Sequence, residues 1–222
     1  MSVLVVKCGG AVASSAAASI RSLAASGRPV CVVHGAGPQI SAEMARRGLP
    51  VQFVGGRRLT TPAALAVVRE SLAAVNWTLC EALGPRAVGL MGDAIGLEAI
   101  PLPKLGLVGD PVPSRPAAVV RALGQGLVPV VAPLARGPLN VNADEAAAAL
   151  AVGLGARSLL FVSDVPGVLV GGSPLASIGS DEADRLLREG MFEGGIVPKL
   201  TAAVRAVRGG VHAQIGETAV LP

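Results

Sequence analysis

The sequence predicts an α/β protein with a mainly parallel, buried central sheet. The stretch 3–11 (VLVVKCGGA) is a continuous apolar run that ends in a lysine and two glycines, which is typical of a strand covered on both faces. A second apolar run at 30–33 is again followed by a glycine turn and a helical segment. The order strand, glycine turn and helix thus occurs twice within the first 47 residues, as in α/β folds.

The remaining elements are expected to alternate in the same way. Helices are expected at 14–26, 39–47, 62–83, 114–125, 145–154, 181–189 and 199–208. Further strands are expected at 51–54, 87–91, 127–131 and 158–162, with a final β pair at 211–215 and 218–221. The polar stretch 55–61 is expected to be a loop, and the Gly- and Pro-rich stretch 92–110 to form compact hairpins over one edge.

The longest predicted helix, 62–83, carries a narrow apolar seam. Its members repeat at alternating spacings of three and four: Leu65, Val68, Leu72, Val75 and Leu79. Such a seam suits packing on the protein's own sheet or, equally, contact with a second copy of the chain.

The start of the alanine-rich helix near residue 145 has a capping pattern. Asn142 and Glu145 have the three-residue spacing of a capping box, and Asp144 would lie in the first turn, where the helix dipole favours a carboxylate. This capping pattern accounts for Asn142 and Glu145, but it gives no reason for the nearby Asn140.

Composition argues against several classes of protein. The formal net charge is +4, aromatic residues make up 2% and the lysines are not clustered, so no nucleic-acid partner is expected. Cys8, Cys31 and Cys80 are far apart, which argues against a zinc site and against disulfides. We see no signal peptide and no uninterrupted apolar span long enough for a bilayer, so a cytoplasmic protein without a membrane partner is expected.

Lysine is rare in this chain. Only three of the 19 basic residues are lysines, Lys7, Lys104 and Lys199, and the other 16 are arginines. A position that keeps lysine against this background is a candidate for a compact point charge, although a solvated charge at a strand end is the simpler alternative. Gly9 and Gly10 favour the chemical role for Lys7, because their backbone can approach an anion closely.

The second glycine turn, HGAGP at 34–38, brings backbone N–H groups and a helix N-terminus together, which suits phosphate. It lacks the third glycine of a dinucleotide fingerprint, and on this motif alone an ordinary tight turn is the stronger interpretation. His34 is expected to be a hydrogen-bonded strand-end residue and Cys8 a small packed residue rather than a nucleophile. Asp164 could order a type II turn with Pro166 and Gly167 at its centre.

Eight segments together resemble the amino acid kinase family. They are KCGG (7–10), VHGAGPQI (33–40), GGRRLT (55–60), LGLVGD (105–110), LVPVVAPLA (127–135), LNVNADEAA (139–147), LLFVSDVPGVL (159–169) and GGIVPKLTAAVRAVRGGV (194–211). They follow the family order over nearly the whole chain, so the set is specific although each segment alone is weak.

The resemblance implies one three-layer αβα sandwich domain over residues 1–222. Lobe 1–137 would bind the acyl amino acid and form a homodimer, and lobe 138–222 would bind ATP. The segments are most similar to members that phosphorylate the side-chain carboxylate of N-acetyl-L-glutamate in arginine biosynthesis. No protein ligand to a metal is expected, because ATP phosphates and water would hold most of the Mg²⁺ shell.

The same resemblance assigns roles by position. Lys7 would contact the transferring phosphoryl group from the substrate side and Lys199 from the nucleotide side, with Asp144 orienting both lysines. Backbone donors to the phosphoryl oxygens would be Gly10 and Gly37. Expected at the acyl amino acid are Arg58, Asn140, Gly35 and Ala36. Expected at the nucleotide are Gly9, Ser163, Asp164 and Gly167.

These residue types suit the chemistry. Phosphoryl transfer needs positioning and stabilisation of charge on the equatorial oxygens, which two lysines and glycine N–H groups supply. A glutamate side chain with a pKa of about 4.3 is already ionised at neutral pH, so it needs no general base. The presence of only two histidines therefore does not count against this reaction.

Several alternatives stay open at this stage. Ala36 stands where the family usually has the middle of three glycines, and Arg57 could be the ligand instead of Arg58. GGRRLT also suits kinases of carrier-protein-linked 2-aminoadipate or glutamate, and a non-catalytic nucleotide-binding regulatory paralogue is a third possibility. The chain begins directly at the first strand, without the extension of arginine-inhibited hexameric members, which predicts a homodimer insensitive to arginine.

Overall fold

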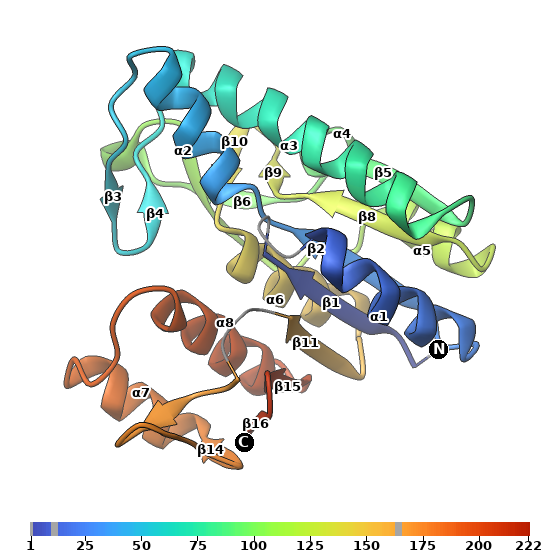
Figure 1. Ribbon diagram of the computed structural model, residues 1–222, viewed down its shortest axis with the longest axis vertical. Helices are drawn as coiled ribbons and strands as arrows, with labels where there is room; N and C mark the ends of the chain where they lie inside the picture. The colour runs from blue at the N-terminus through green and yellow to red at the C-terminus, as the bar shows by residue number, and fades with distance from the viewer. Residues whose placement is uncertain (1, 10–12, 163–165) are drawn as a thin grey trace.

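The computed structural model describes residues 2–9, 13–162 and 166–222. A large sheet runs through the whole molecule (Figure 1). Its strands, in spatial order, are β14 (Ser177–Gly179), β16 (Thr218–Leu221), β15 (His212–Ile215), β11 (Ser158–Val162), β1 (Leu4–Cys8), β2 (Val30–His34), β8 (Val128–Ala132) and β5 (Ala87–Met91).

The sheet is mainly parallel, as predicted. All neighbouring pairs from β15 to β5 are parallel, and the C-terminal pair β15 and β16 is antiparallel. The first strand of the chain, β1, lies in the middle of the sheet between β2 and β11. Its five residues are all buried, which explains the continuous apolar run in the sequence.

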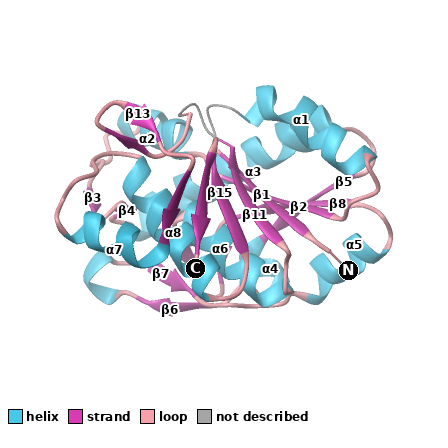
Figure 2. Ribbon diagram, turned by 90° about the horizontal axis from the view of Figure 1, so that it is seen from below, coloured by secondary structure: helices cyan, strands magenta, loops and turns pink. Residues whose placement is uncertain are grey.

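Helices cover both faces of the sheet and confirm the three-layer αβα architecture (Figure 2). One face is covered by α1 (Ala13–Ala25), α2 (Gly37–Arg46) and α3 (Pro62–Leu83). The other is covered by α5 (Ala117–Gly124), α6 (Ala143–Leu154), α7 (Ser180–Arg188) and α8 (Ile196–Arg208). The helices α2, α6 and α8 begin two to three residues earlier than the sequence patterns suggested.

The apolar seam of α3 packs inside the chain. Leu65, Val68, Leu72, Val75 and Leu79 are all buried in the cluster formed with the sheet, α1 and α2. Of the two interpretations of this seam, packing on the protein's own sheet is therefore the one that the structure supports. Among the described helices, α3 is also the one long and apolar enough, by length and composition alone, to cross a membrane, a test that buried core helices pass as well.

Smaller β elements lie beside the main sheet. β6 (Ala99–Pro101), β7 (Val108–Pro111), β10 (Leu139–Val141) and β9 (Leu134–Ala135) form a four-stranded sheet, and β12 (Leu169–Val170) pairs with β13 (Ser173–Pro174). The predicted hairpin at 92–110 exists as β6 and β7, but a short helix, α4 (Gly92–Ile95), and a 3₁₀ turn (Pro103–Leu105) accompany it.

The prediction of a loop at 55–61 is wrong in part. Arg57–Arg58 forms strand β4, which pairs with β3 (Phe53–Val54) as an antiparallel hairpin. Gly55 and Gly56 form its turn, and both have positive φ, which glycine adopts without strain. We refer to residues 53–58 as the arginine hairpin.

Candidate active site

Lys7 reaches the site because of the alternation of β1. Val3 and Val5 belong to the core cluster on the α6 face of the sheet, whereas Leu4, Val6 and Cys8 belong to the cluster on the α3 face. Successive side chains of a strand point to opposite faces, so Lys7 points to the α6 face at the carboxyl end of β1. This places its ammonium group at the N-terminus of α6.

Lys7 pairs there with Asp144, which lies in the first turn of α6. The distance from Lys7 Nζ to Asp144 Oδ1 is 2.8 Å, and the two side chains are only 6% and 8% exposed. Oδ1 makes no directed hydrogen bond within the described chain, so the contact is an ion pair rather than an aligned hydrogen bond. Because a buried carboxylate without a counter-charge is costly, removal of Lys7 alone would leave Asp144 in an unfavourable environment.

A cavity of about 260 Å³ opens next to this ion pair. It lies where the carboxyl ends of β1 and β2 meet the N-termini of α2 and α6 and the arginine hairpin. Of the predicted site residues, those that line it are Lys7, Gly9, Gly35, Ala36, Gly37, Arg58, Asn140 and Asp144. Ligands of open α/β sheets bind at this end of the strands.

The second glycine turn forms one wall of the cavity. The Gly35 N–H donates to the carbonyl of Cys8 at 2.9 Å, which ties the ends of β1 and β2 together. Ala36 is the N-cap of α2 and supplies no side-chain cap, and a Cβ added at Gly37 would meet nothing within 4 Å. The helix thus presents an uncapped N-terminus beside open space, an arrangement that suits phosphate. The Ala36 methyl group packs in the core cluster with Ile40 and Met44.

The two adjacent arginines have different partners. Arg58 is 6% exposed; its Nη2 donates to Ser41 Oγ at 2.8 Å and to the Gly37 carbonyl at 3.2 Å, and its guanidinium lies over the Phe53 ring at 4.6 Å. Burial lowers the pKa of the Arg58 guanidinium from its ordinary value, although arginine stays protonated in proteins.

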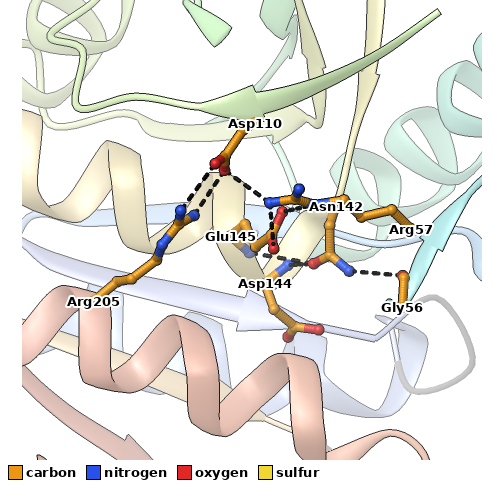
Figure 3. A network of polar contacts seen from close by, with 7 residues as sticks. All are labelled: Gly56, Arg57, Asp110, Asn142, Asp144, Glu145 and Arg205. Carbon is orange, nitrogen blue, oxygen red and sulfur yellow. Dashed lines mark hydrogen bonds and ion pairs between the residues drawn. The ribbon is translucent and has the colours of Figure 1, made fainter. Parts of the chain in front are cut away.

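Arg57 also lines the cavity, but its guanidinium is bound by two carboxylates. Its Nε and Nη2 donate to Glu145 at 3.0 and 2.9 Å, and Nη2 also donates to Asp110 Oδ1 at 2.9 Å. Asp110 in turn accepts two hydrogen bonds from Arg205 (Figure 3). This network could not be predicted from the sequence, because no local pattern connects residues 95 positions apart.

Two asparagines, one in β10 and one at the start of α6, form hydrogen bonds to the arginine hairpin and to Thr60, which follows it. Asn140 Nδ2 donates to Thr60 Oγ1 at 3.0 Å, and Asn142 Nδ2 donates to the Gly56 carbonyl at 3.2 Å. Asn142 Oδ1 accepts from the N–H groups of Asp144 and Glu145, so the predicted cap is confirmed on this side. Glu145 pairs with Arg57, and that contact accounts for its side chain better than the second half of a capping box.

Lys199 lies in the first turn of α8, and its Nζ donates to the Gly195 carbonyl at 3.1 Å. It is not among the described residues that line the cavity.

Gly167 does not line the cavity either, and a Cβ added there would lie 2.5 Å from Thr218 Oγ1. Its φ is not positive, whereas the third residue of a type II turn needs a positive φ. The predicted type II turn centred on Pro166 and Gly167 is therefore wrong. Three further predicted site residues, Gly10, Ser163 and Asp164, lie outside the described residues.

His34 is a structural residue of the core. Asn76 Nδ2 donates to the Val130 carbonyl at 2.9 Å and lies 3.1 Å from His34 Nε2, so Nε2 accepts the second amide proton. The ring proton is then assigned to Nδ1, which faces the Gly35 carbonyl at 3.3 Å. Desolvation lowers the pKa of His34 to about 4, and it therefore stays neutral at physiological pH. This confirms the predicted hydrogen-bonded strand-end role.

Neither Cys8 of β1 nor Cys31 of β2 has the lowered thiol pKa that a nucleophile needs. Burial raises the pKa of the Cys8 thiol to about 11, against a smaller opposite effect of Lys7, and that of Cys31 to about 12. Both thiols are therefore protonated at neutral pH. Across residues 2–9, 13–162 and 166–222, no group of three or more His, Cys, Asp or Glu side chains is placed to hold a metal ion.

Comparisons with known proteins agree with the family resemblance seen in the sequence. The amino acid kinase family profile matches residues 2–216. An acetylglutamate kinase from Rubrobacter xylanophilus is 42% identical over an alignment covering 97% of this chain and 88% of the relative. One from Geobacillus sp. strain WCH70 is 38% identical, with 94% and 87% covered.

Solved structures share the architecture. The crystal structure of smu.665 from Streptococcus mutans UA159 superposes with a TM-score of 0.89 at 28% identity, covering 99% of this chain and 98% of that one. Carbamate kinase from Giardia lamblia bound to AMP-PNP superposes with a TM-score of 0.75 at 16% identity, over 99% and 98%, which shows a shared fold. From the family profile and these long alignments, we conclude that the chain belongs to the amino acid kinase family.

Proposed function

We propose that this protein is an acetylglutamate kinase of arginine biosynthesis, which converts N-acetyl-L-glutamate and ATP into N-acetylglutamyl 5-phosphate and ADP. The observation that carries the proposal is the buried Lys7–Asp144 pair beside a cavity with an uncapped helix N-terminus. The names of relatives 38–42% identical to this chain support the substrate.

In the proposed reaction a carboxylate oxygen of the substrate attacks the γ-phosphorus, and the bond between that phosphorus and the ADP oxygen breaks. The carboxylate is already ionised, so no side chain has to remove a proton. Lys7 stabilises charge on the transferring group from the substrate side, and Lys199 does so from the nucleotide side. Asp144 holds Lys7 in place, and Gly10 and Gly37 donate N–H groups to the phosphoryl oxygens.

The substrate and nucleotide are proposed to occupy different lobes. Lobe 1–137 holds the acyl amino acid: Arg58 binds its α-carboxylate, Gly35 and Ala36 line its site, and Asn140 reaches over from the second lobe to the acetamido end. A guanidinium suits this carboxylate because it can donate two parallel hydrogen bonds.

Lobe 138–222 is proposed to hold ATP, with Ser163, Asp164 and Gly167 beside it and Gly9 contributing from the first turn. The cavity is compatible with a phosphate group carrying its own Mg²⁺, since its described lining offers a helix N-terminus and Lys7 but a single carboxylate, Asp144, which Lys7 already binds. When bound, Mg²⁺ supplies charge neutralisation, and the phosphates and water hold it.

Trapping of the acyl phosphate with hydroxylamine tests this function. Incubation with ATP, Mg²⁺ and N-acetyl-L-glutamate should give a hydroxamate, and Lys7→Ala and Lys199→Ala should abolish it. Lys104→Ala is the matched control, because this third lysine is exposed and is not among the residues that line the cavity; it should keep full activity. A hydroxamate formed only from carrier-linked 2-aminoadipate or glutamate would contradict the proposed substrate, and none from any acid would contradict a kinase.

A homodimer in the cytoplasm is a further part of the proposal. β5 is the last strand of the main sheet, and Trp77 on the adjoining α3 is 70% exposed beside a surface hollow of about 750 Å³. An exposed sheet edge next to a large apolar side chain is suited to a second copy of the chain. Light scattering should give twice the 22.0 kDa chain mass, and Trp77→Asp should return it to one chain; a wild-type monomer would contradict the dimer. Cell fractionation tests the location.

A further inference from the structure

The carboxylate of Asp110 is bound by two arginines that come from opposite sides of the site. Arg57 Nη2 donates to Oδ1 at 2.9 Å, and Arg205 donates with Nη1 at 2.8 Å to Oδ1 and with Nη2 at 3.0 Å to Oδ2 (Figure 3). Arg57 also makes a two-point contact with Glu145. The four charges alternate in sign and form one chain of contacts, Glu145, Arg57, Asp110 and Arg205.

Each end of this chain lies on a helix that carries a residue proposed for catalysis. Glu145 follows Asp144 directly in the first turn of α6. Arg205 lies on α8, the helix whose first turn carries Lys199. The network therefore connects the arginine hairpin and α6 with α8, the helix that carries Lys199. The function proposed above gives no role to this connection.

The contacts differ from ordinary surface ion pairs. The side chains of Glu145, Arg57 and Asp110 are 9%, 19% and 25% exposed and that of Arg205 is 45% exposed, and two of the pairings are two-point guanidinium–carboxylate contacts. Such geometry is stronger and more directional than a single exposed pair. The hydrogen bonds from Arg205 hold the pKa of Asp110 below its usual range, so the carboxylate remains charged throughout the physiological range.

The arginine hairpin and α8 also approach each other directly. A Cβ added at Gly56, in the turn of the hairpin, would lie 3.7 Å from Pro198 Cβ, and Pro198 is the neighbour of Lys199. Asp110 and its arginines are thus a second link, two turns further along α8. Two points of attachment along one helix fix its direction as well as its position.

We propose that Asp110 is a positioning residue for phosphoryl transfer, which orients α8 and hence Lys199 against the substrate side by binding Arg57 and Arg205 simultaneously. The inference rests on the proposed function. Its physical basis is that phosphoryl transfer depends mainly on positioning, and a displacement of about 1 Å can cost about 100-fold in rate. Without this link, the apolar face of α8 and the contact at Pro198 would have to position Lys199 without the polar attachment at Arg205.

Steady-state kinetics of Arg205→Met test the inference. We expect kcat to fall at least 10-fold, while KM for N-acetyl-L-glutamate changes less than twofold, because Arg205 does not line the substrate cavity. Arg208→Met is the matched control: Arg208 lies on the same helix, but it pairs with Asp181 and Asp184 of α7. A raised KM with unchanged kcat, or an equal loss of kcat in the control, would overturn the inference.

A double variant distinguishes one shared contact from two separate effects. If Asp110 and Arg205 act together, Asp110→Asn combined with Arg205→Met should be no slower, within twofold, than the slower single variant. Losses that multiply would show independent roles and contradict the inference.

Hydrogen exchange provides a readout that does not depend on the substrate. In Asp110→Asn, amides of both the arginine hairpin and α8 should exchange at least twofold faster than in the wild type. Faster exchange at one element only, or at neither, would overturn the inference even if the enzyme is active. If the wild type is inactive but Asp110→Asn still shows faster exchange at both elements, the proposed function is refuted and the coupling between the two elements stands.

Discussion

Lowering the pH from 8 to 5 should destabilise this protein through His34. Its imidazole is fully buried, and its Nε2 accepts a hydrogen bond from Asn76, so a second ring proton would meet an N–H donor. The pKa of His34 is about 4 in the folded protein against an ordinary value of 6.5. The unfolded chain therefore binds the proton first as the pH falls, and the stability present above pH 6.5 is lost progressively down to pH 4.

The size of the effect follows from this difference in pKa. Linkage over the two pKa values gives a loss of about 2 kcal/mol at pH 5 relative to pH 8. Urea unfolding followed by circular dichroism at pH 8, 6.5 and 5 measures it directly. Carboxylates contribute to the same pH range, so the informative quantity is the difference between the wild type and His34→Gln.

We expect His34→Gln to be less stable than the wild type at pH 8, and this gap to shrink by about 2 kcal/mol at pH 5. His212→Gln, which alters an exposed histidine on β15, is the control and should follow the wild type at every pH. If the wild type and His34→Gln lose stability in parallel between pH 8 and 5, the assignment of a neutral, desolvated imidazole is wrong.

Two further predictions concern packing and substrate binding. Gly153→Ala should destabilise the protein by about 1–3 kcal/mol, because its Cβ would lie 2.1 Å from the Ser114 carbonyl oxygen, whereas Gly124→Ala, with no atom within 4 Å, should stabilise by up to about 1 kcal/mol. Thermal unfolding of both variants checks this, and equal effects would contradict it. Arg58→Lys should raise KM for N-acetyl-L-glutamate about 10- to 100-fold with kcat within threefold, since one ammonium cannot replace a two-point contact. An unchanged KM would remove Arg58 from the substrate site.

Elements with local signals could be predicted well from the sequence. The helix at 62–83 and the strand at 87–91 agree with the structure to the residue. The helix begins after Thr61, whose side chain accepts from Ala64 N–H, and it ends at Gly84. These signals act within one turn of the chain, so they are readable without tertiary information.

Elements that depend on distant partners could not be predicted in this way. The strand at Arg57–Arg58 is polar and two residues long, and it is stabilised by contacts to α2, α6 and β7 rather than by its own propensity. The Lys7–Asp144 pair joins positions 137 apart, and only the family resemblance suggested it before the structure brought the residues together. Local patterns accounted for Asp144 as a helix-start carboxylate, which is true but incomplete.

The central place of β1 has a consequence for how the chain is made. β1 is synthesised first, yet one of its two neighbours, β11, is completed only at Val162. The half-sheet β1, β2, β8 and β5 can form once Ala132 has left the ribosome, and until 30 more residues have emerged, β1 is an apolar strand with one unpaired edge. At about 5–20 residues per second this lasts about 2–6 s on the ribosome. The strand that carries Lys7, the lysine proposed for catalysis, is thus open to wrong pairing during synthesis.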